Sequence, residues 1–266
     1  HDEVRNYVGS LVAWLDDPRD LPLHTYDHPE LLRDTDWIYW WAGTRMQKLL
    51  QDPPARVLDV RSSRAYESAH IPWSVNIDVG DDIFEHSAAH WADRLGAVGI
   101  DRGIEVVVCD AQLSHRMTSV FWLLEYLGHP KVSVCAEGIE GWSASYNTTD
   151  EPTIVAEPEG PLDVAVHPTR FELRRDGKRV LSAIDQPPVH SSFDRTWVWA
   201  SGGDPSELPV GEVVRIPSDE HLTEEGALKE AFALWRLYEN AGVSKFSEVV
   251  VAGDSVADAS MNYFAL

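Results

Sequence analysis

The first half of the chain alternates short apolar runs with stretches in which apolar residues recur at helical spacing. Continuous apolar runs predict buried strands, and strands that alternate with helices are typical of a parallel sheet covered on both faces. The predicted strands cover residues 56–60, 74–77, 104–109 and 131–135. The predicted helices cover residues 37–50, with Asp36 as the capping residue, and the segments 84–95 and 117–127.

The same pattern divides the chain into four segments. Residues 1–35 are polar with a short helical stripe, which predicts an N-terminal extension packed on the main body. Residues 36–149 form the first predicted α/β domain, and the acidic, proline-rich segment 150–161 is the predicted linker. Residues 162–266 form the second predicted domain.

The second domain repeats the order of the first in a weaker form. The pattern predicts a helix near residues 177–184, a strand around Val189, a strand at 213–216, a helix at 228–240 and a strand at 248–251. The repeat length of roughly 130 residues is too long for a solenoid, so it indicates two copies of one domain.

Composition limits the partners of this chain. It has 44 acidic against 22 basic residues and a net charge of −22, which would repel nucleic acid and anionic lipid. No apolar run approaches the length of a membrane span, and no charged-then-apolar leader follows His1. We therefore expect a soluble protein with cationic or protein partners, while the two cysteines do not distinguish cytoplasm from periplasm.

Three motifs in the first half occur in a characteristic order. The first is Val57-Leu58-Asp59-Val60-Arg61-Ser62 followed by the segment 69–77, which contains His70-Ile71-Pro72. The second joins the strand 106–110 to the helix 122–128, and the third joins Val132-Ser133-Val134 to Gly138 and Trp142. Together they resemble the rhodanese (thiosulfate sulfurtransferase) superfamily over residues 36–145.

The second half resembles the same family in the segments 208–217, 237–243 and 249–253. The resemblance implies two rhodanese-like domains, each a parallel α/β sheet with helices on both faces, the second degenerate. Its copy stops at Leu266, before the last strand and helix of the family. We therefore expect the second domain to be incomplete, or to be completed by the N-terminal extension around Trp14 and Leu15 or by a partner chain. The segment with Trp197 and Trp199 is the expected contact for the completing segment.

The resemblance also indicates where catalytic groups should stand. Members of the family carry sulfur as a persulfide on a cysteine at a strand end, and the N–H groups of the following loop stabilise the sulfur anion. In the second domain that position is Gly253. The loop that follows begins with Asp254-Ser255 and reaches Asp258, and its two carboxylates would repel a small anion. In the first domain it is Asp110 or Ala111, depending on loop length.

Cys109 lies one or two residues before that position. If Asp110 holds the position, Cys109 points to the opposite face of the strand and acts as a small buried hydrophobe. The alternative is a displaced nucleophile near Ser114, His115 and Arg116. A phosphatase Cys-x5-Arg motif does not fit, because six residues separate Cys109 from Arg116.

The sequence predicts neither a metal nor a cofactor. His86 and His90 are spaced like zinc ligands on a helix, but no third ligand is marked by spacing.

The leading functional hypothesis is a catalytically inactive binding, scaffolding or regulatory module, acting through a protein partner or as a homo-oligomer. One alternative is a sulfurtransferase that uses Cys109. A second alternative is a structural subunit whose second domain is completed by a partner chain.

Overall fold

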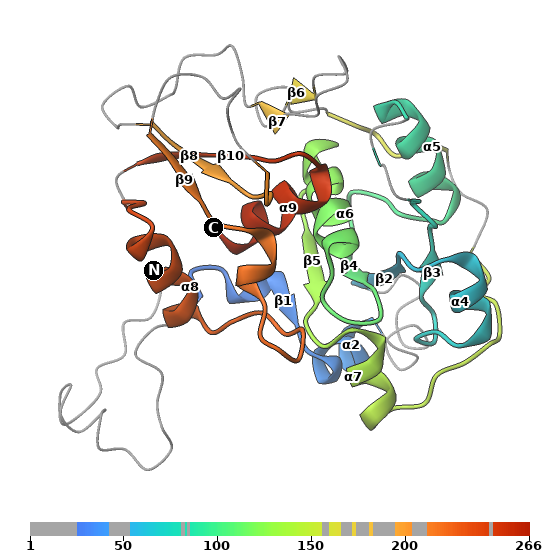
Figure 1. Cartoon of the computed structure of the whole chain (residues 1–266). Coiled ribbons are helices and arrows are strands. Elements are labelled where there is room, and N and C mark those ends of the chain that lie inside the picture. Colours follow the sequence, from blue (N-terminus) through green and yellow to red (C-terminus); the bar gives the residue numbers. More distant parts are fainter. Residues whose placement is uncertain are drawn as a thin grey trace, which may run out of the picture.

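The computed structural model describes residues 26–42, 54–80, 83, 86–155, 160–165, 172–173, 181–182, 195–203, 212–244 and 247–266 (Figure 1). Its first sheet has five parallel strands in the order β1-β5-β4-β2-β3. They are β1 (Leu32–Arg33), β2 (Ala55–Asp59), β3 (Val75–Asn76), β4 (Glu105–Cys109) and β5 (Val132–Cys135). The four strands predicted from the apolar runs are thereby confirmed. The short β1 falls within residues 1–35 and pairs with β5, so Leu32 and Arg33 are part of the sheet.

Helices cover both faces of this sheet because successive strand residues point to opposite sides. On one face, Val106 and Val108 pack with α5 (Ala88–Ala97) and α6 (His115–Tyr126). On the other face, Val107 and Cys109 pack with α2 (Thr35–Trp41) and α7 (Gly138–Ser145). A short helix, α4 (Ser63–Ser68), follows β2.

The second sheet has three parallel strands in the order β10-β8-β9. They are β8 (Arg195–Trp199), β9 (Glu212–Arg215) and β10 (Glu248–Ala252). The helices α8 (Ala231–Asn240) and α9 (Val256–Ala265) accompany it, and a two-stranded ribbon of β6 (Glu172–Leu173) and β7 (Leu181–Ser182) precedes it. Two 3-10 turns, η1 (Pro29–Leu31) and η3 (Ser218–His221), complete the described elements.

The second sheet repeats the core of the first one. Its order β10-β8-β9 corresponds to β4-β2-β3, and the last residues of β4 and β10 pair alike, Cys109 with Asp59 and Ala252 with Trp199. The prediction of two α/β units built on parallel sheets is therefore confirmed.

Several local expectations were wrong. Leu181 and Ser182 form a strand rather than part of the predicted helix 177–184, and Asp34 rather than Asp36 caps α2. The helix predicted from residue 228 begins at Ala231. Trp197 and Trp199 are buried on one face of β8 and are unavailable as a partner contact. The strand expected around Val189 and the residues Trp14 and Leu15 lie outside the described residues.

The two units meet through α6 and α9. The hydroxyl of Ser260 lies 2.9 Å from that of Thr118 and 3.1 Å from that of Ser119. Phe121 and Phe264 pack edge to face, and the Tyr263 hydroxyl donates to Glu125 at 2.6 Å. α6 follows β4 and α9 follows β10. The contact between these helices therefore also brings the β4–α6 loop and the β10–α9 loop to one region of the molecule.

Leu124, fully buried on α6, provides a test of the first core. We expect Leu124→Ala to lower the free energy of unfolding by about 2–5 kcal/mol, because truncation leaves a cavity that the close-packed core does not fill. Urea-induced unfolding followed by tryptophan fluorescence measures the change. The control Val213→Ala, at a position 36% exposed on β9, should cost less than about 1 kcal/mol. Equal losses in the two variants would contradict the assigned burial.

Candidate functional site

The candidate site of the first unit is the loop between β4 and α6. Asp110 follows the strand, and Ser114 caps the helix by accepting a hydrogen bond from the N–H of Met117. The Asp110 carboxylate accepts from the N–H of Ala111 and from the hydroxyl of Ser114, both at 2.7 Å, and Arg116 lies 3.8 Å away. Asp110 is buried, so its carboxylate occupies the donors that this end of the loop offers.

A second ion pair supports this loop from the end of β2. The Arg61 guanidinium donates to both carboxylate oxygens of Asp59 and also to the carbonyl of Ala69 at 2.7 Å. The N–H groups of Ile139 and Glu140, at the start of α7, hold the loop carbonyls of Asp110 and Ala111. The loop is therefore fixed on several sides by its own chain.

Cys109 does not join these residues. It lies on the opposite face of β4, fully buried with Cys135, Val107 and Trp142. A hydrogen bond with Cys135, together with burial, raises the pKa of the Cys109 thiol well above its ordinary value. The thiol is therefore neutral near pH 7, whereas a nucleophilic cysteine needs a thiolate.

His115 and Arg116 are the first residues of α6. The Arg116 side chain is partly exposed and faces Asp110, while His115 is half-buried and close enough to His221 of the second unit to affect its pKa. Among the described residues, neither side chain forms a hydrogen bond with Cys109. The structure therefore does not place Cys109 with Ser114, His115 and Arg116, as a displaced nucleophile would require.

The second unit closes its strand-end loop in another way. Ser201 follows β8, and its hydroxyl accepts from the N–H of Asp254 at 2.7 Å and donates to Asp258 at 2.8 Å. Ser218 also donates to Asp258, at 3.3 Å, and Ser255 caps α9 by accepting from the N–H of Asp258. The N–H that could face an anion is thus taken by Ser201.

Gly253 stands between these groups. A Cβ added there would lie 3.0 Å from the Ser201 hydroxyl and 3.5 Å from the Cβ of Asp258. A larger side chain at this position would therefore contact the hydrogen-bonded pair of Ser201 and Asp258.

Ser201 and Ser218 were not identified from the sequence. Because Trp199 pairs with Ala252 as Asp59 pairs with Cys109, Ser201 corresponds to Arg61. The second unit thus has Trp199 and Ser201 where the first has its Asp–Arg ion pair. Reading the Trp-x-Trp segment as a buried strand would have revealed this correspondence.

The two histidines that are spaced like zinc ligands lie side by side in the structure. His86 and His90 stack with ring centroids 4.0 Å apart, and the described residues contain no group of three side chains that could hold a metal. None of the described helices is long and apolar enough to cross a membrane.

Comparison with known proteins extends this picture. Residues 43–145 match the family model described as a rhodanese-like domain. The chain is 28% identical to a sulfur carrier protein of Thermus thermophilus, named TtuD, over 91% of this chain and 88% of that protein. It is 25% identical to the 3-mercaptopyruvate sulfurtransferase of Rattus norvegicus, over 76% of this chain and 75% of that protein.

Among solved structures, the chain is similar in fold to the 3-mercaptopyruvate sulfotransferase SseA of Escherichia coli. The TM-score is 0.65 at 18% identity, covering 88% of this chain and 92% of that one. This likeness extends over both α/β units.

His221, next to the second loop, gives the fold a pH dependence. Its Nδ1 lies 3.0 Å from the carbonyl of Ser218, and its Nε2 lies 2.8 Å from the hydroxyl of Tyr238. Burial lowers the pKa of His221 from its ordinary 6.5 to about 4. Between these two values the unfolded chain binds the proton and the folded chain does not, so stability rises with pH in this window.

We therefore expect the free energy of unfolding to fall by about 3 kcal/mol as the pH drops from 6.5 to 4, beyond the change shown by a His221→Gln variant. Denaturant unfolding at a series of pH values measures the difference. Val213→Ala provides the control, since it changes no titratable group at a position 36% exposed on β9 and should keep the slope of the unmodified protein. A His221→Gln variant with an unchanged slope would contradict the assignment.

Proposed function

With residues 43–145 forming a domain of the rhodanese-like family, we propose that this protein is a member that no longer carries sulfur and serves as a binding, scaffolding or regulatory module. One observation carries the proposal: the strand-end positions of the two units hold Asp110 and Gly253, and neither side chain is a thiol. Without a thiolate there is no atom to take the sulfane sulfur from a donor and hold it as a persulfide.

The surroundings of both positions support the proposal. In the first unit the Asp110 carboxylate accepts from the N–H of Ala111 and the hydroxyl of Ser114, so an anionic donor such as thiosulfate would meet a negative charge beside these two groups. In the second unit Ser201 and Asp258 lie beside Gly253, and Ser201 accepts from the N–H of Asp254 while donating to Asp258. A small anion would have to displace these contacts and approach two carboxylates.

A sulfurtransferase is the second candidate function, and the names of the two similar proteins, a sulfur carrier protein and a sulfurtransferase, favour it. In that reaction a cysteine thiolate takes the outer sulfur of thiosulfate, releasing sulfite, and then passes the sulfur to cyanide as thiocyanate. The nearest thiol to a strand-end position is Cys109, which is fully buried with a raised pKa. The first unit would have to open β4 to expose it.

Thiocyanate release separates the two functions. With thiosulfate or 3-mercaptopyruvate as donor and cyanide as acceptor, we expect the unmodified protein to remain at the rate of the buffer. Cys109→Ser should give the same rate. Robust turnover that Cys109→Ser abolishes would replace the proposal with the sulfurtransferase that uses Cys109.

Restoring a thiol alone should not restore activity. We expect Gly253→Cys to release little thiocyanate, because Asp254 and Asp258 still repel the anionic donor and Ser201 crowds the new side chain. The double variant Gly253→Cys with Asp258→Ala removes one carboxylate and its contact with Ser201, so it should exceed the single variant in rate. Full activity in the single variant would show that the surrounding charges do not limit the site.

A further inference from the structure

The two cysteines of the chain lie side by side in the first sheet. Cys109 ends β4 and Cys135 ends β5. These strands are parallel, and their register pairs Val108 with Val134, so the two cysteines that follow stand opposite each other. Both side chains belong to the cluster that packs against α2 and α7, so they point to the same face of the sheet.

The spacing of the two strands suits a bond between these sulfurs. Neighbouring strands lie about 4.8 Å apart, and a disulfide joins residues whose Cα atoms are about 4.4–6.8 Å apart. The two thiols already meet through their hydrogen bond. Each is also held from its other side, since Cys109 pairs with Asp59 of β2. Cys135 pairs in the same way with Arg33 of β1, so the sheet keeps the two thiols together.

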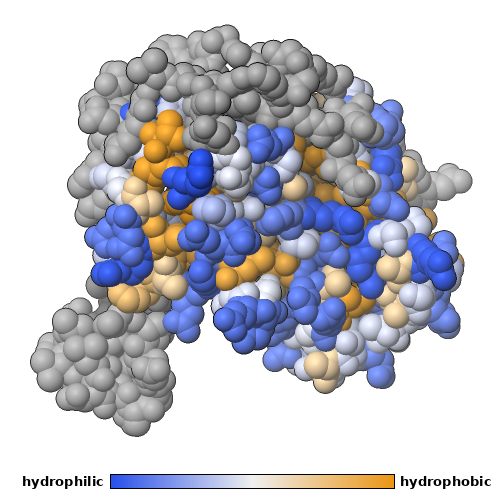
Figure 2. Space-filling view, viewed as in Figure 1, coloured by the Kyte–Doolittle hydropathy of each residue, from blue (hydrophilic) through white to orange (hydrophobic). Residues whose placement is uncertain are grey.

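The surroundings of the pair favour reaction of the sulfurs with each other. Val107, Ile139 and Trp142, which share the cluster, carry no metal-binding atom, and the described residues hold no group of three side chains for a metal ion. Cys109 is 1% exposed and Cys135 is fully buried. Figure 2 shows hydrophilic residues over most of the described surface in view, with hydrophobic residues between them. An oxidant that reaches the pair therefore has to be small.

We propose that Cys109 and Cys135 are a site of reversible oxidation, at which a peroxide joins them by a disulfide bond. One sulfur loses its proton and attacks a peroxide oxygen, so the O–O bond breaks, a sulfenic acid forms and the released hydroxide takes up that proton. The second thiol attacks this sulfur, forms the S–S bond and releases water. Two thiols thus lose two electrons and two protons, and hydrogen peroxide becomes two water molecules. A dithiol reverses the reaction and itself becomes a disulfide.

The disulfide would act on the loop between β4 and α6 and on the start of α7, because these segments follow the two joined strand ends. The N–H of Ile139 at the start of α7 donates to the carbonyl of Asp110 at 3.0 Å. The N–H of Glu140 donates to the carbonyl of Ala111 at 3.1 Å. Tying the strand ends together therefore holds the loop more firmly in the oxidised chain than in the reduced chain.

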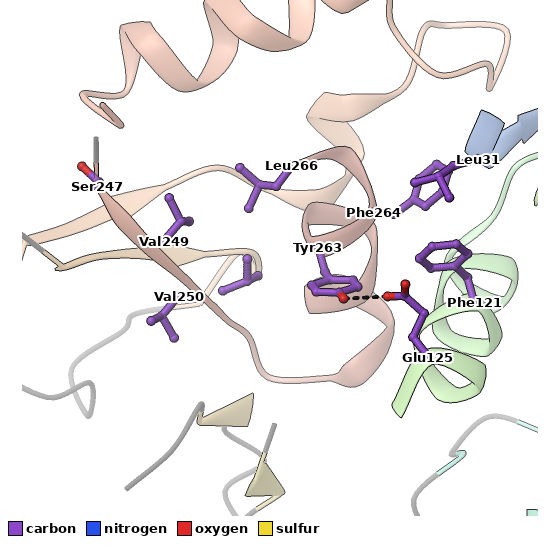
Figure 3. Close-up of a pocket in the computed structure, with 10 residues that line it drawn as sticks. Leu31, Phe121, Glu125, Ser247, Val249, Val250, Tyr263, Phe264 and Leu266 are labelled. Carbon is purple, nitrogen blue, oxygen red and sulfur yellow. Dashed lines mark hydrogen bonds between the residues drawn. The ribbon is translucent and has the colours of Figure 1, made fainter. Parts of the chain in front are cut away.

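The contact between the two units lies on the other face of the first sheet. α6 packs on that face. Figure 3 shows Glu125 of α6 joined to Tyr263 of α9 by their hydrogen bond, with Phe121 beside Phe264. We expect the disulfide to leave this contact unchanged. The inference goes beyond the proposed function, and its test does not depend on whether either strand-end loop transfers sulfur.

The test treats the unmodified 266-residue chain with hydrogen peroxide, blocks the remaining thiols with N-ethylmaleimide in denaturant and digests the product with trypsin. We expect the peptides 103–116 and 132–170 to appear joined, since the first contains Cys109 and the second Cys135. Dithiothreitol should separate them. The raised pKa of Cys109 keeps that thiol protonated near pH 7, so oxidation at pH 9 should be roughly tenfold faster or more.

Matched variants tie the bond to the register of the strands. Cys109→Ser and Cys135→Ser each leave one sulfur, so neither should give joined peptides within one chain. The double variant Ser133→Cys with Cys135→Ser keeps the composition and moves one thiol two residues along β5, to the position opposite Val107. This shift of about 6.6 Å along the strand should lower the yield of joined peptides at least about tenfold.

Amide exchange followed by NMR compares the loop in the reduced and the oxidised chain. We expect the N–H groups of Ile139 and Glu140 to exchange roughly tenfold more slowly after oxidation. The N–H of Ala200 in the second unit donates to the carbonyl of Ala252 and should exchange at the same rate in both states.

Four results would overturn the inference. Two alkylated cysteines after prolonged treatment would show that the pair resists oxidation. Sulfinic acids without joined peptides would show that the sulfurs do not meet. A covalent dimer would place the disulfide between chains. Equal exchange of Ile139 and Glu140 in the two states would remove the effect on the loop.

Discussion

The structure depends on the requirement that a buried parallel strand be paired on both sides. β4 meets this requirement through β2 and β5, and its apolar side chains enter separate clusters on the two faces of the sheet. Such double coverage is what parallel sheets need, because their backbone groups and both faces are removed from water. Pairing on both sides holds the carboxyl end of β4 in place, and Asp110 follows it in the loop that leads to α6. Gly253 follows β10 as Asp110 follows β4, but among the described strands β10 pairs with β8 alone.

The two units fill the same strand-end position by different physical means. The first places a carboxylate there and lets that carboxylate use the loop N–H of Ala111 and the Ser114 hydroxyl. The second removes the side chain and satisfies the N–H of Asp254 through Ser201. In both, an anion would have to replace a hydrogen bond already made within the chain, so it would gain little net free energy on binding. The absence of a thiol at the two positions and the use of these donors within the chain would both act against the binding of a sulfur-donating anion.

The sequence predicts the first unit well and the second unit only in part. Valine runs such as Val106–Val108 are buried on both faces, so their hydrophobicity alone marks a strand. β8 carries the same structural role with Trp197 and Trp199, whose size suits a core or an interface equally, and its position was not recognised. Ser201 could not be assigned because its role follows from the pairing of Trp199 with Ala252, and pairing is a property of the fold. In the first unit the sequence narrowed the position only to Asp110 or Ala111, because the length of the loop before the helix was not fixed by the pattern. The end of β4 at Cys109 places Asp110 directly after the strand.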